Sequence, residues 1–386
     1  MQDMETRISQ INPENVDKLL ARLRQGKGKP TAAGTTRRRF DPTRDANFRL
    51  EIGSPGNFDS LSCHLCPRVP PPPGELEVEV YAGGMNFRDV MIALGVYPTA
   101  PGEIPALGGD FAGKVAAVGE GVEGFNIGDE VMGIGRHCFG AYVNVEAGDT
   151  LHKPQHMTFE EAVTIPVVFY TVYIALCTQA DLWPGESILI HSAAGGVGLA
   201  AIQYARKVGA EIFATAGTPE KRDYLRAMGV KYVMDSRSLS FVEETLAATN
   251  DEGVDVILNS LPGEAILKGL ELLRPFGRFV DIGKRDIVED MQVGLLPFAK
   301  GISFSSITLG LMDRCRVGFR RRMATELTQW FNDGSLQALP FRSYPIMKAT
   351  DAFFHLSEGK HIGKVVLSIK DQEVLLDAKS LATPNR

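Results

Sequence analysis

A run of glycines between an apolar segment and an amphipathic one constrains the fold of this chain more than any other feature. Residues 187–191 are short and apolar and follow a Trp-Pro-Gly sequence, which predicts a buried strand. Beyond the glycines, apolar residues recur at helical spacing as far as Val208, so Gly195, Gly196 and Gly198 lie in a tight strand-to-helix turn. Because these glycines lack a Cβ atom, the backbone can approach a pyrophosphate, whose charge the N–H groups of the helix N-terminus stabilise. The sequence therefore predicts a nucleotide-binding site.

The glycine turn belongs to a longer alternation of strands and helices in residues 167–306. The expected strands cover residues 187–191, 211–215, 231–234, 254–258 and 277–282, with helical patterns between them. This alternation predicts an α/β domain of right-handed βαβ units with a doubly wound parallel sheet.

Short strands fill the sequence on either side of this domain. Residues 46–166 hold short alternating strands separated by glycines. In a second segment, residues 307–372, the chain has a helical stretch over 314–331 and returns to strand-like sequence over 337–369. Alternation of apolar and polar positions is typical of antiparallel sheets with one solvated face. We expect one β-barrel domain, formed by both segments and interrupted by the nucleotide-binding domain.

The two ends of the chain are predicted to be connecting segments. Residues 1–45 are expected to be a linker, with a short amphipathic helix over 15–25 and a basic, flexible stretch over 26–39. Residues 373–386 are expected to be a tail. A chain that begins in this way is more easily pictured as cut from, or joined to, a larger polypeptide.

Composition and charge argue against several classes of protein. The 386 residues carry a formal net charge of −6, which argues against a partner of nucleic acid. No apolar run is expected to reach membrane-spanning length, so no membrane partner is expected. Five cysteines in so long a chain do not make a disulfide framework, which favours a cytoplasmic location. Cys63 and Cys66 have the spacing of a zinc-binding pair, but no second pair completes such a site.

Four stretches of the sequence resemble one protein family. They are residues 84–95, 108–113, 193–198 and 277–284. They make residues 47–370 similar to the zinc-free medium-chain dehydrogenase/reductases, and more closely to the enoyl reductase domain of modular polyketide synthases. The resemblance implies a GroES-like β-barrel catalytic domain interrupted by a Rossmann domain. It also implies two kinds of partner: an acyl carrier protein with a phosphopantetheine-linked enoyl substrate, and other polyketide synthase domains.

The resemblance also bears on metal binding. Zinc-dependent relatives carry Cys where this chain has Asn86, and His where it has Gly109. Two zinc ligands are thereby lost, and the four-cysteine structural lobe of those relatives is missing from this sequence too. We expect no metal site, so hydrogen-bond donors must activate the substrate.

The choice of cofactor depends on the end of the second strand of the nucleotide-binding domain. A site that prefers NAD usually ends this strand with Asp or Glu, but residues 215–218 contain neither. Lys221 and Arg237 follow nearby, and cations suit a 2′-phosphate, so NADPH is the expected cofactor. The alternative is that Lys221 and Arg222 form an ordinary solvated helix face. The expected cofactor contacts are Tyr170, Thr171, Ala194, Gly195, Gly196, Val197, Gly198, Thr215, Thr218, Lys221, Ser236, Arg237, Asn259, Ile282 and Gly283.

Three residues are the candidates for catalysis. The resemblance implies hydride addition to the β-carbon of an α,β-unsaturated thioester, which leaves an enolate to be stabilised and protonated. Lys284 is then the implied proton donor or electrostatic partner, with a surface lysine as the alternative. Relatives place an Asp where this chain aligns Thr308, and Asp286 is a substitute suggested only by its nearness in sequence. Asn86 is expected either to orient the nicotinamide or substrate, or to cap a helix.

Other functions and other roles stay open. A γ-halogenated enoyl thioester could close a cyclopropane ring after the same hydride addition. The remaining functional alternatives are an NADPH:quinone oxidoreductase and a non-catalytic nucleotide-binding module. Tyr170 and Thr171 either contact the cofactor or serve helix packing. Finally, Arg314, Arg316 and Arg320–Arg322 form either a docking face for an acidic carrier protein or a solvated helix face.

Overall fold

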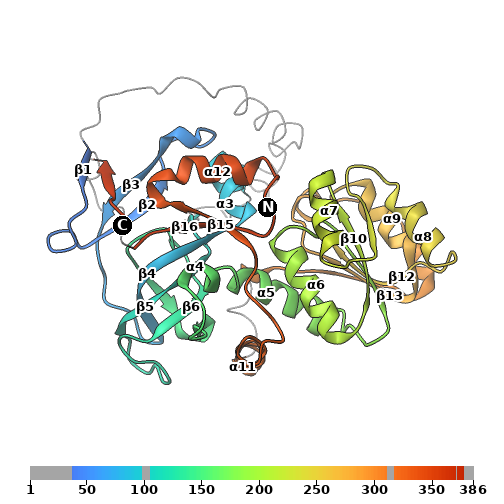
Figure 1. Ribbon diagram of the computed structural model, residues 1–386, viewed down its shortest axis with the longest axis horizontal. Coiled ribbons are helices and arrows are strands. Elements are labelled where there is room, and N and C mark those ends of the chain that lie inside the picture. Colours follow the sequence, from blue (N-terminus) through green and yellow to red (C-terminus); the bar gives the residue numbers. More distant parts are fainter. Residues whose placement is uncertain (1–36, 98–104, 311–316, 371, 378–386) are drawn as a thin grey trace. The chain divides into compact units, whose positions relative to one another are not determined.

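The protein forms two compact units (Figure 1). The structure is a computed structural model that describes residues 37–97, 105–310, 317–370 and 372–377. Unit 1 contains the described residues up to Pro166 and from Pro340 onward, and unit 2 is Val167–Leu339. The expected helix over residues 15–25 lies outside the described residues.

Unit 2 is built around a six-stranded parallel sheet. In spatial order its strands are β11 (Tyr232–Asp235), β10 (Glu211–Ala216), β9 (Ser187–Ile190), β12 (Val254–Asn259), β13 (Leu273–Asp281) and β14 (Ser303–Ser306). The helices between them are α6 (Gly196–Val208), α7 (Pro219–Ala227), α8 (Phe241–Ala248) and α9 (Glu264–Leu272). Because the strand order reverses direction beside β9, this sheet confirms the predicted doubly wound topology.

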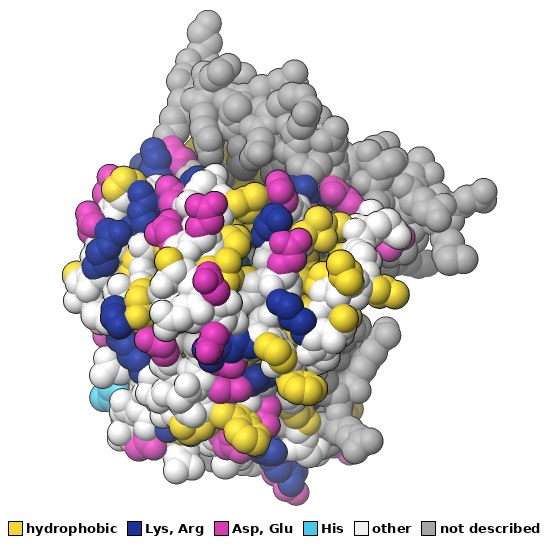
Figure 2. Space-filling model, turned by 90° about the vertical axis from the view of Figure 1, so that its right-hand side faces the viewer, with side chains coloured by type: hydrophobic (Ala, Val, Ile, Leu, Met, Phe, Trp, Pro, Cys, Tyr) yellow, Lys and Arg dark blue, Asp and Glu magenta, His cyan; other side chains and the backbone are white. Residues whose placement is uncertain are grey.

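The helices of unit 2 cover both faces of its sheet, α6 and α7 on one face and α8 and α9 on the other (Figure 1). All four residues of β9 are buried, which is why its sequence is an unbroken apolar run. Leu189, Phe213, Ile257 and Phe279 belong to one hydrophobic core. Figure 2 shows the face at the right of Figure 1, where basic and acidic side chains are interspersed.

Unit 1 contains two β-sheets. The larger one has, in spatial order, β15 (Phe341–Pro345), β16 (Lys364–Ser368), β4 (Glu75–Met85), β5 (Asp110–Val118), β6 (Glu130–Ile134) and β8 (Thr150–His152), and β7 (Tyr142–Glu146) pairs with β4. The smaller one has β1 (Arg37–Arg39), β17 (Leu375–Asp377), β3 (Leu61–Cys66) and β2 (Asn47–Ile52). Helices α3 (Phe87–Leu94) and α12 (Ala349–Ser357) are in contact. Segments from both ends of the sequence thus share one β domain, as predicted.

The two ends of unit 1 differ from the expectation of a linker and a tail. Strands β1 and β17, which lie in those segments, pair with each other. Arg38 donates two hydrogen bonds, of 2.7 and 2.6 Å, to the Asp45 carboxylate. Phe40 packs edge-on against Phe48, with 4.9 Å between the ring centroids. Helix α12 also lies where strand was expected, and its buried residues recur at helical spacing.

The end of unit 2 differs from the expected boundary as well. The sequence places the return to the barrel domain at residue 307, whereas unit 2 continues to Leu339. The reason is helix α11 (Val317–Asn332), whose Phe331 packs edge-on against Phe169 with 4.8 Å between ring centroids. Because Phe169 belongs to unit 2, this contact keeps α11 with that unit.

Among the described residues, one helical run is long and apolar enough to cross a membrane, by length and composition, contrary to expectation. It covers Phe159–Gln179 and contains an 18-residue window with a mean hydropathy of 1.6. Its parts are α4 (Phe159–Ala162), α5 (Pro166–Val172) and a π-helical turn over Tyr173–Gln179. Since 72% of that window is buried inside the protein, the run has the burial of a core helix.

Replacing Phe331 with Ala is expected to lower the free energy of unfolding of unit 2 by about 3–5 kcal/mol. The substitution removes a fully buried ring and leaves a cavity against Phe169. Urea denaturation followed by tryptophan fluorescence measures the change. Gln329→Ala, on the exposed side of the same helix, is the control and should change stability by less than about 0.5 kcal/mol. Equal losses in both variants would contradict the packing of α11 on Phe169.

Candidate active site

The glycine turn of unit 2 connects β9 to α6 and has no room for a side chain at its centre. A Cβ atom on Gly198 would lie 2.4 Å from the Cα atom of Ala193, a backbone atom that cannot move aside alone. At Gly195, the N-cap of α6, the nearest atom to an added Cβ would be the Ser192 carbonyl oxygen at 3.3 Å. The first turn of α6 is therefore held tightly against the turn before it. This arrangement leaves N–H groups of a helix N-terminus available to a phosphate.

Two cationic side chains gather where β10 ends. A Cβ atom on Gly217 would lie 2.7 Å from Arg237 Nε and 3.3 Å from Ser236 Oγ, so both side chains lie over the backbone at this strand end. Lys221 is only 9% exposed, and its pKa is lowered by burial and then by Arg237. Thr218 caps α7 by accepting a hydrogen bond from the Lys221 N–H. A partly buried pair of cations at this place suits a phosphate group.

The burial of Lys221 argues against the alternative of a solvated helix face. Its neighbour Arg222 has a different environment, because it donates a 3.0 Å hydrogen bond to the Ala216 carbonyl. Arg222 also forms an ion pair of 3.1 Å with Asp235. The two consecutive cations of α7 thus have different surroundings.

A hollow of about 210 Å³ lies beside Arg237. The segment after β11 forms one wall, with Ser236, Arg237 and Leu239, and the segment after β12 forms the other, with Leu261 and Pro262. Leu239, Leu261 and Pro262 give this hollow apolar surface beside Arg237, which suits a base that is joined to a phosphorylated ribose. Together with the glycine turn, this hollow shows that the residues of unit 2 fit a dinucleotide.

Two residues behind the turn stabilise it from inside the unit. His191, at the end of β9, is 3% exposed, and its Nδ1 lies 3.0 Å from the Thr215 hydroxyl. Burial lowers the pKa of His191 to about 3, so the ring is neutral. Its Nε2 is buried without a hydrogen-bond partner among the described residues. Thr215 is fully buried, and its expected contact with the cofactor stays a prediction. No pattern in the sequence pointed to His191.

The loop after β13 is fixed by a buried carboxylate. Asp281 is 1% exposed, and burial raises its pKa. It accepts hydrogen bonds from Asn259 Nδ2, at 2.9 Å, and from the Gly283 N–H, at 3.0 Å. The Ile282 N–H in turn donates to the Asn259 carbonyl. Asn259, Ile282 and Gly283 thus shape the loop that carries Lys284.

Lys284 and Thr308 meet at the carboxyl ends of β13 and β14. The Lys284 ammonium donates hydrogen bonds of 2.5 Å to the Ile307 carbonyl and 2.6 Å to the Thr308 hydroxyl. Burial lowers the pKa of Lys284, and the carboxylate of Asp281 opposes this shift. These contacts disfavour the alternative of an ordinary surface lysine, and a catalytic role of Lys284 stays a prediction.

The Asp286 carboxylate is bound within unit 2, and its role as a substitute acid stays a prediction. Its carboxylate is nearly buried and accepts a 3.0 Å hydrogen bond from the Gly263 N–H. Its closest described cation is Arg285, at 3.9 Å. These contacts tie the Asp286 carboxylate to the loop before α9.

In unit 1, Asn86 belongs to a buried polar network. Lys364, on β16, donates hydrogen bonds of 2.7 Å to Asn86 Oδ1 and 2.8 Å to Asp110 Oδ2. Asn86 Nδ2 donates to the same Asp110 oxygen at 2.9 Å. Asp89 accepts hydrogen bonds from the Asn86 and Gly108 N–H groups, and burial raises its pKa to about 6.

This network changes the interpretation of Asn86. Its side chain bridges Asp110 and Lys364, so orientation of the nicotinamide by Asn86 stays a prediction. Lys364 was not predicted from the sequence; it is 4% exposed and lies far from Asp110 along the chain. Its ammonium already supplies a cation beside the buried carboxylate. Within the described ranges, no group of three or more His, Cys, Asp or Glu side chains could hold a metal ion.

The remaining predicted contacts lie in α5, at the glycine turn and near α11. Tyr170 is fully buried, and the Thr171 hydroxyl donates to the Val167 carbonyl at 2.7 Å, which favours the packing alternative for both. Ala194 is buried and Val197 is half-buried, both at the glycine turn. Arg314 and Arg316 lie outside the described residues, so only part of the expected basic cluster is seen.

Gly198→Ala is expected to lower the thermal midpoint of unit 2 and weaken dinucleotide binding, because its Cβ atom would overlap the backbone of Ala193. Gly294→Ala is the control, since Gly294 lies outside the glycine turn and an added Cβ atom would meet nothing within 4 Å. Calorimetric unfolding and fluorescence titration with NADPH measure both effects. A similar result for the two variants would show that the close contact at Gly198 does not shape the turn.

Comparisons with known proteins agree with this geometry. Residues 72–169 match the family described as alcohol dehydrogenase GroES-like domain, and residues 196–326 match the family described as zinc-binding dehydrogenase. The chain is 42% identical over 325 residues to the phthioceranic/hydroxyphthioceranic acid synthase of Mycobacterium tuberculosis. It is also 42% identical over 324 residues to a phenolphthiocerol/phthiocerol polyketide synthase of the same organism. Each match covers 84% of this chain and 15% of the relative, so the chain spans a small part of the length of these relatives.

Two solved structures are also similar over 84% of this chain. The CurK enoyl reductase is 39% identical with a TM-score of 0.77, and 100% of that chain is covered. The CurF ER cyclopropanase from the curacin A biosynthetic pathway is 34% identical with a TM-score of 0.77, and 99% of that chain is covered. The protein therefore belongs to the medium-chain dehydrogenase/reductase superfamily and, within it, to the enoyl reductase domains of polyketide synthases.

Proposed function

We propose that the chain reduces an α,β-unsaturated thioester carried by an acyl carrier protein, with NADPH as the cofactor. The observation that carries this proposal is the position of Lys284, whose ammonium lies beside Thr308 at the carboxyl ends of two parallel strands. Ligands of doubly wound sheets bind at that edge. The identity to the CurK enoyl reductase supports the same reaction.

The residues of unit 2 offer a place for each part of the cofactor. The glycine turn at the start of α6 would hold the pyrophosphate. Ser236, Arg237 and the ammonium of Lys221 would hold the 2′-phosphate, and the hollow beside Leu261 would hold the adenine. NADPH, when bound, supplies the hydride that reduces the β-carbon of the substrate.

Lys284 is the proposed proton donor and electrostatic partner. Hydride addition places negative charge on the thioester oxygen, which a fixed ammonium stabilises. The two hydrogen bonds to Ile307 and Thr308 hold that ammonium in one position. Because burial lowers its pKa, Lys284 gives up a proton more readily than an ordinary lysine. Thr308 accepts from Lys284 and keeps one O–H group to donate to a substrate oxygen or to water.

Cyclopropane ring closure is a second candidate, favoured by one expectation and one similarity. The family resemblance implies a carboxylic acid at the place of Thr308, and a hydroxyl cannot deliver a proton in the same way at neutral pH. The CurF ER cyclopropanase is 34% identical to this chain. On a substrate with chloride on the γ-carbon, the α-carbon of the enolate would bond to the γ-carbon as chloride leaves. That step needs no proton and is fast when the two carbons are held in line.

Turnover of small thioesters separates these functions. Crotonyl-pantetheine should support NADPH oxidation, and Lys284→Met should lower kcat about 100-fold or more. Lys268→Met, on α9, is the matched control and should leave kcat unchanged. Mass analysis of the product from γ-chlorocrotonyl-pantetheine decides between a chlorinated saturated product and ring closure with loss of hydrogen chloride. Oxidation of NADPH by a quinone but by neither thioester would overturn both candidates in favour of a quinone oxidoreductase.

Arg237→Gln is expected to lower the affinity ratio of NADPH to NADH about tenfold, because one charge-assisted hydrogen bond to the 2′-phosphate is lost. Arg237 is exposed, so the substitution should leave the fold intact. Fluorescence titration with both cofactors measures the ratio. Lys231→Gln, at the opposite end of β11, is the control. An equal loss of affinity for both cofactors would contradict the assignment of Arg237.

The partners of the chain remain proposals of the same kind. Arg320–Arg322 lie on α11, where Arg322 forms a 2.8 Å hydrogen bond with Glu326 of the same helix. Docking of an acidic carrier protein on this face, contact with other polyketide synthase domains and a cytoplasmic location stay predictions. A non-catalytic nucleotide-binding module is disfavoured by the fixed ammonium of Lys284.

A further inference from the structure

Asp281, the last residue of β13, forms hydrogen bonds on both sides of its strand. Its carboxylate accepts a hydrogen bond of 2.9 Å from the side chain of Asn259, the residue that pairs with it at the end of β12. Its carbonyl accepts the N–H of Ile307, directly after β14, at 2.9 Å. Asp281 therefore connects the carboxyl ends of three neighbouring strands.

The same residue fixes both the donor and the acceptor of a hydrogen bond made by Lys284. On the donor side, Asp281 Oδ1 accepts the N–H of Gly283, the residue directly before Lys284, at 3.0 Å. On the acceptor side, the Asp281 carbonyl holds Ile307, whose own carbonyl accepts the Lys284 ammonium at 2.5 Å. The backbone before Lys284 and the acceptor of its ammonium thus share one anchor.

The Asp281 carboxylate lies directly against this backbone. A Cβ atom on Gly283 would be 3.1 Å from Asp281 Oδ1 and 3.4 Å from Oδ2, which is closer than most Cβ atoms approach other atoms. Glycine therefore lets the loop pass over the carboxylate. The position of the loop depends on where the carboxylate lies.

The charges of Asp281 and Lys284 also act on each other. Burial lowers the pKa of Lys284, and the Asp281 carboxylate opposes this shift. Burial raises the pKa of Asp281, Asp286 of α10 (Arg285–Val288) raises it further, and Lys284 lowers it. Each of the two groups thus favours the charged form of the other, in surroundings where water screens charge poorly.

Asp281 has almost no surface that a substrate or a cofactor could contact, since only 1% of it is exposed. Any effect of Asp281 on a reaction must therefore act through its neighbours. Its printed position in the sequence, three residues before Lys284, does not show this, because the contacts depend on β12 and β14 as well.

We propose that Asp281 is a positioning residue for Lys284, whose carboxylate and carbonyl fix the place of the ammonium and whose negative charge stabilises it. The proposal rests on the proposed function, in which Lys284 donates a proton and stabilises the enolate. A fixed ammonium that stays protonated is what both of those roles require.

The first test measures Lys284 on the full chain without turnover. Trace acetylation by acetic anhydride is followed over a range of pH by peptide mass spectrometry, because only the neutral amine reacts. Asp281→Asn removes the charge but keeps an oxygen that can accept from Asn259 and Gly283. The midpoint of Lys284 labelling should move to lower pH, since the ammonium loses its counter-charge. An unchanged midpoint would overturn the proposal.

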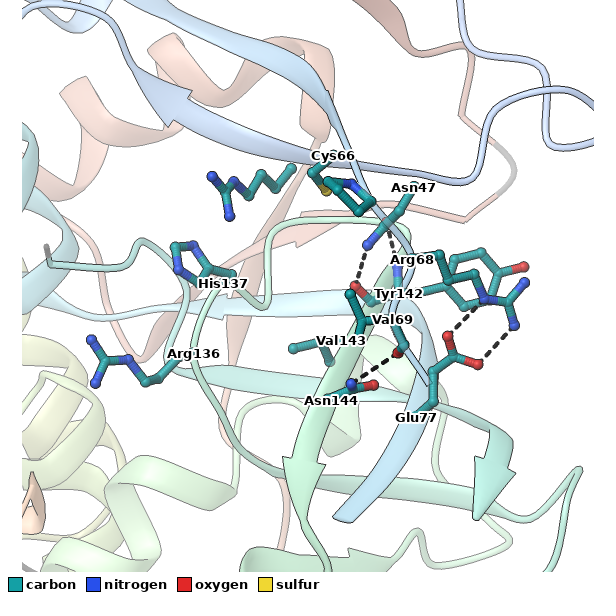
Figure 3. Close-up of a pocket in the computed structure, with 12 residues that line it drawn as sticks. Asn47, Cys66, Arg68, Val69, Glu77, Arg136, His137, Tyr142, Val143 and Asn144 are labelled. Carbon is teal, nitrogen blue, oxygen red and sulfur yellow. Dashed lines mark hydrogen bonds and ion pairs between the residues drawn. The ribbon is translucent and has the colours of Figure 1, made fainter. Parts of the chain in front are cut away.

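Glu77→Gln is the matched control for this experiment. Glu77 is a buried carboxylate of unit 1 that accepts hydrogen bonds of 2.6 and 2.8 Å from Arg68 (Figure 3). The pair lies at a second hollow, of about 410 Å³. This variant also removes the charge of a buried, paired carboxylate, but it should leave the labelling midpoint of Lys284 unchanged. An equal shift in both variants would indicate a general loss of structure and contradict a specific role of Asp281.

Kinetics with crotonyl-pantetheine and NADPH provide the second test. Asp281→Ala removes the acceptor of the Gly283 N–H, so kcat should fall about 10- to 100-fold as the ammonium is displaced. Asp281→Asn should restore most of kcat at low pH. Because the reaction needs the ammonium, this variant should lose activity at a lower pH than the parent chain as the pH rises. Equal losses in both variants at every pH would overturn the positioning role.

The two tests separate this proposal from the proposed function. If no thioester is reduced but Asp281→Asn still shifts the labelling midpoint of Lys284, the proposed function fails and the coupling of the two residues stands. If the thioester is reduced but neither the midpoint nor the pH profile moves in Asp281→Asn, the reductase stands and the role of Asp281 fails.

Discussion

The close contact between Gly198 and Ala193 is the constraint on which the nucleotide-binding half of the protein depends. With 2.4 Å between an added Cβ atom and the Ala193 backbone, only glycine lets α6 start directly against the end of β9. The position of α6 then determines where its first N–H groups lie, and the parallel strands place the loops of Arg237 and Lys284 at the same edge of the sheet. The packing of α6 and the strands thus determines where the cofactor site lies. The side chains at the strand ends determine which chemical groups the site can bind.

Much of this unit could be predicted because its signals are local. Strands buried on both faces give unbroken apolar runs, and the strands near residues 187, 211 and 254 were found within one or two residues. The interactions that were missed are not local. Lys364 and Asp110 are 254 positions apart, so their pairing has no signature in the sequence. Thr215 has the right position for a cofactor contact, but its burial against His191 depends on the packing of two strands.

The boundary near residue 307 was missed for a similar reason. A strand-like stretch after a helix suggests a return to the first domain, but a helix belongs to the unit whose core it covers. The contact between Phe331 and Phe169 assigns α11 to unit 2. The sequence does not show which aromatic residues will pack against each other when they lie so far apart. Three arginines of unit 1 show the same limit. Arg49, Arg68 and Arg136 are far apart in the sequence, and only the fold shows that they line one hollow.

The buried histidine behind the glycine turn gives the cofactor domain a weak point towards acid. The pKa of His191 is about 3 in the folded protein, against an ordinary value of 6.5. Between these pH values the imidazole binds a proton in the unfolded chain but stays neutral in the folded protein. Stability is therefore lost as the pH falls below about 6.5, by up to about 1.4 kcal/mol for each pH unit. Acidification would loosen the end of β9 and the turn beside it before it titrates most carboxylates, so the domain should release its nucleotide under mildly acidic stress.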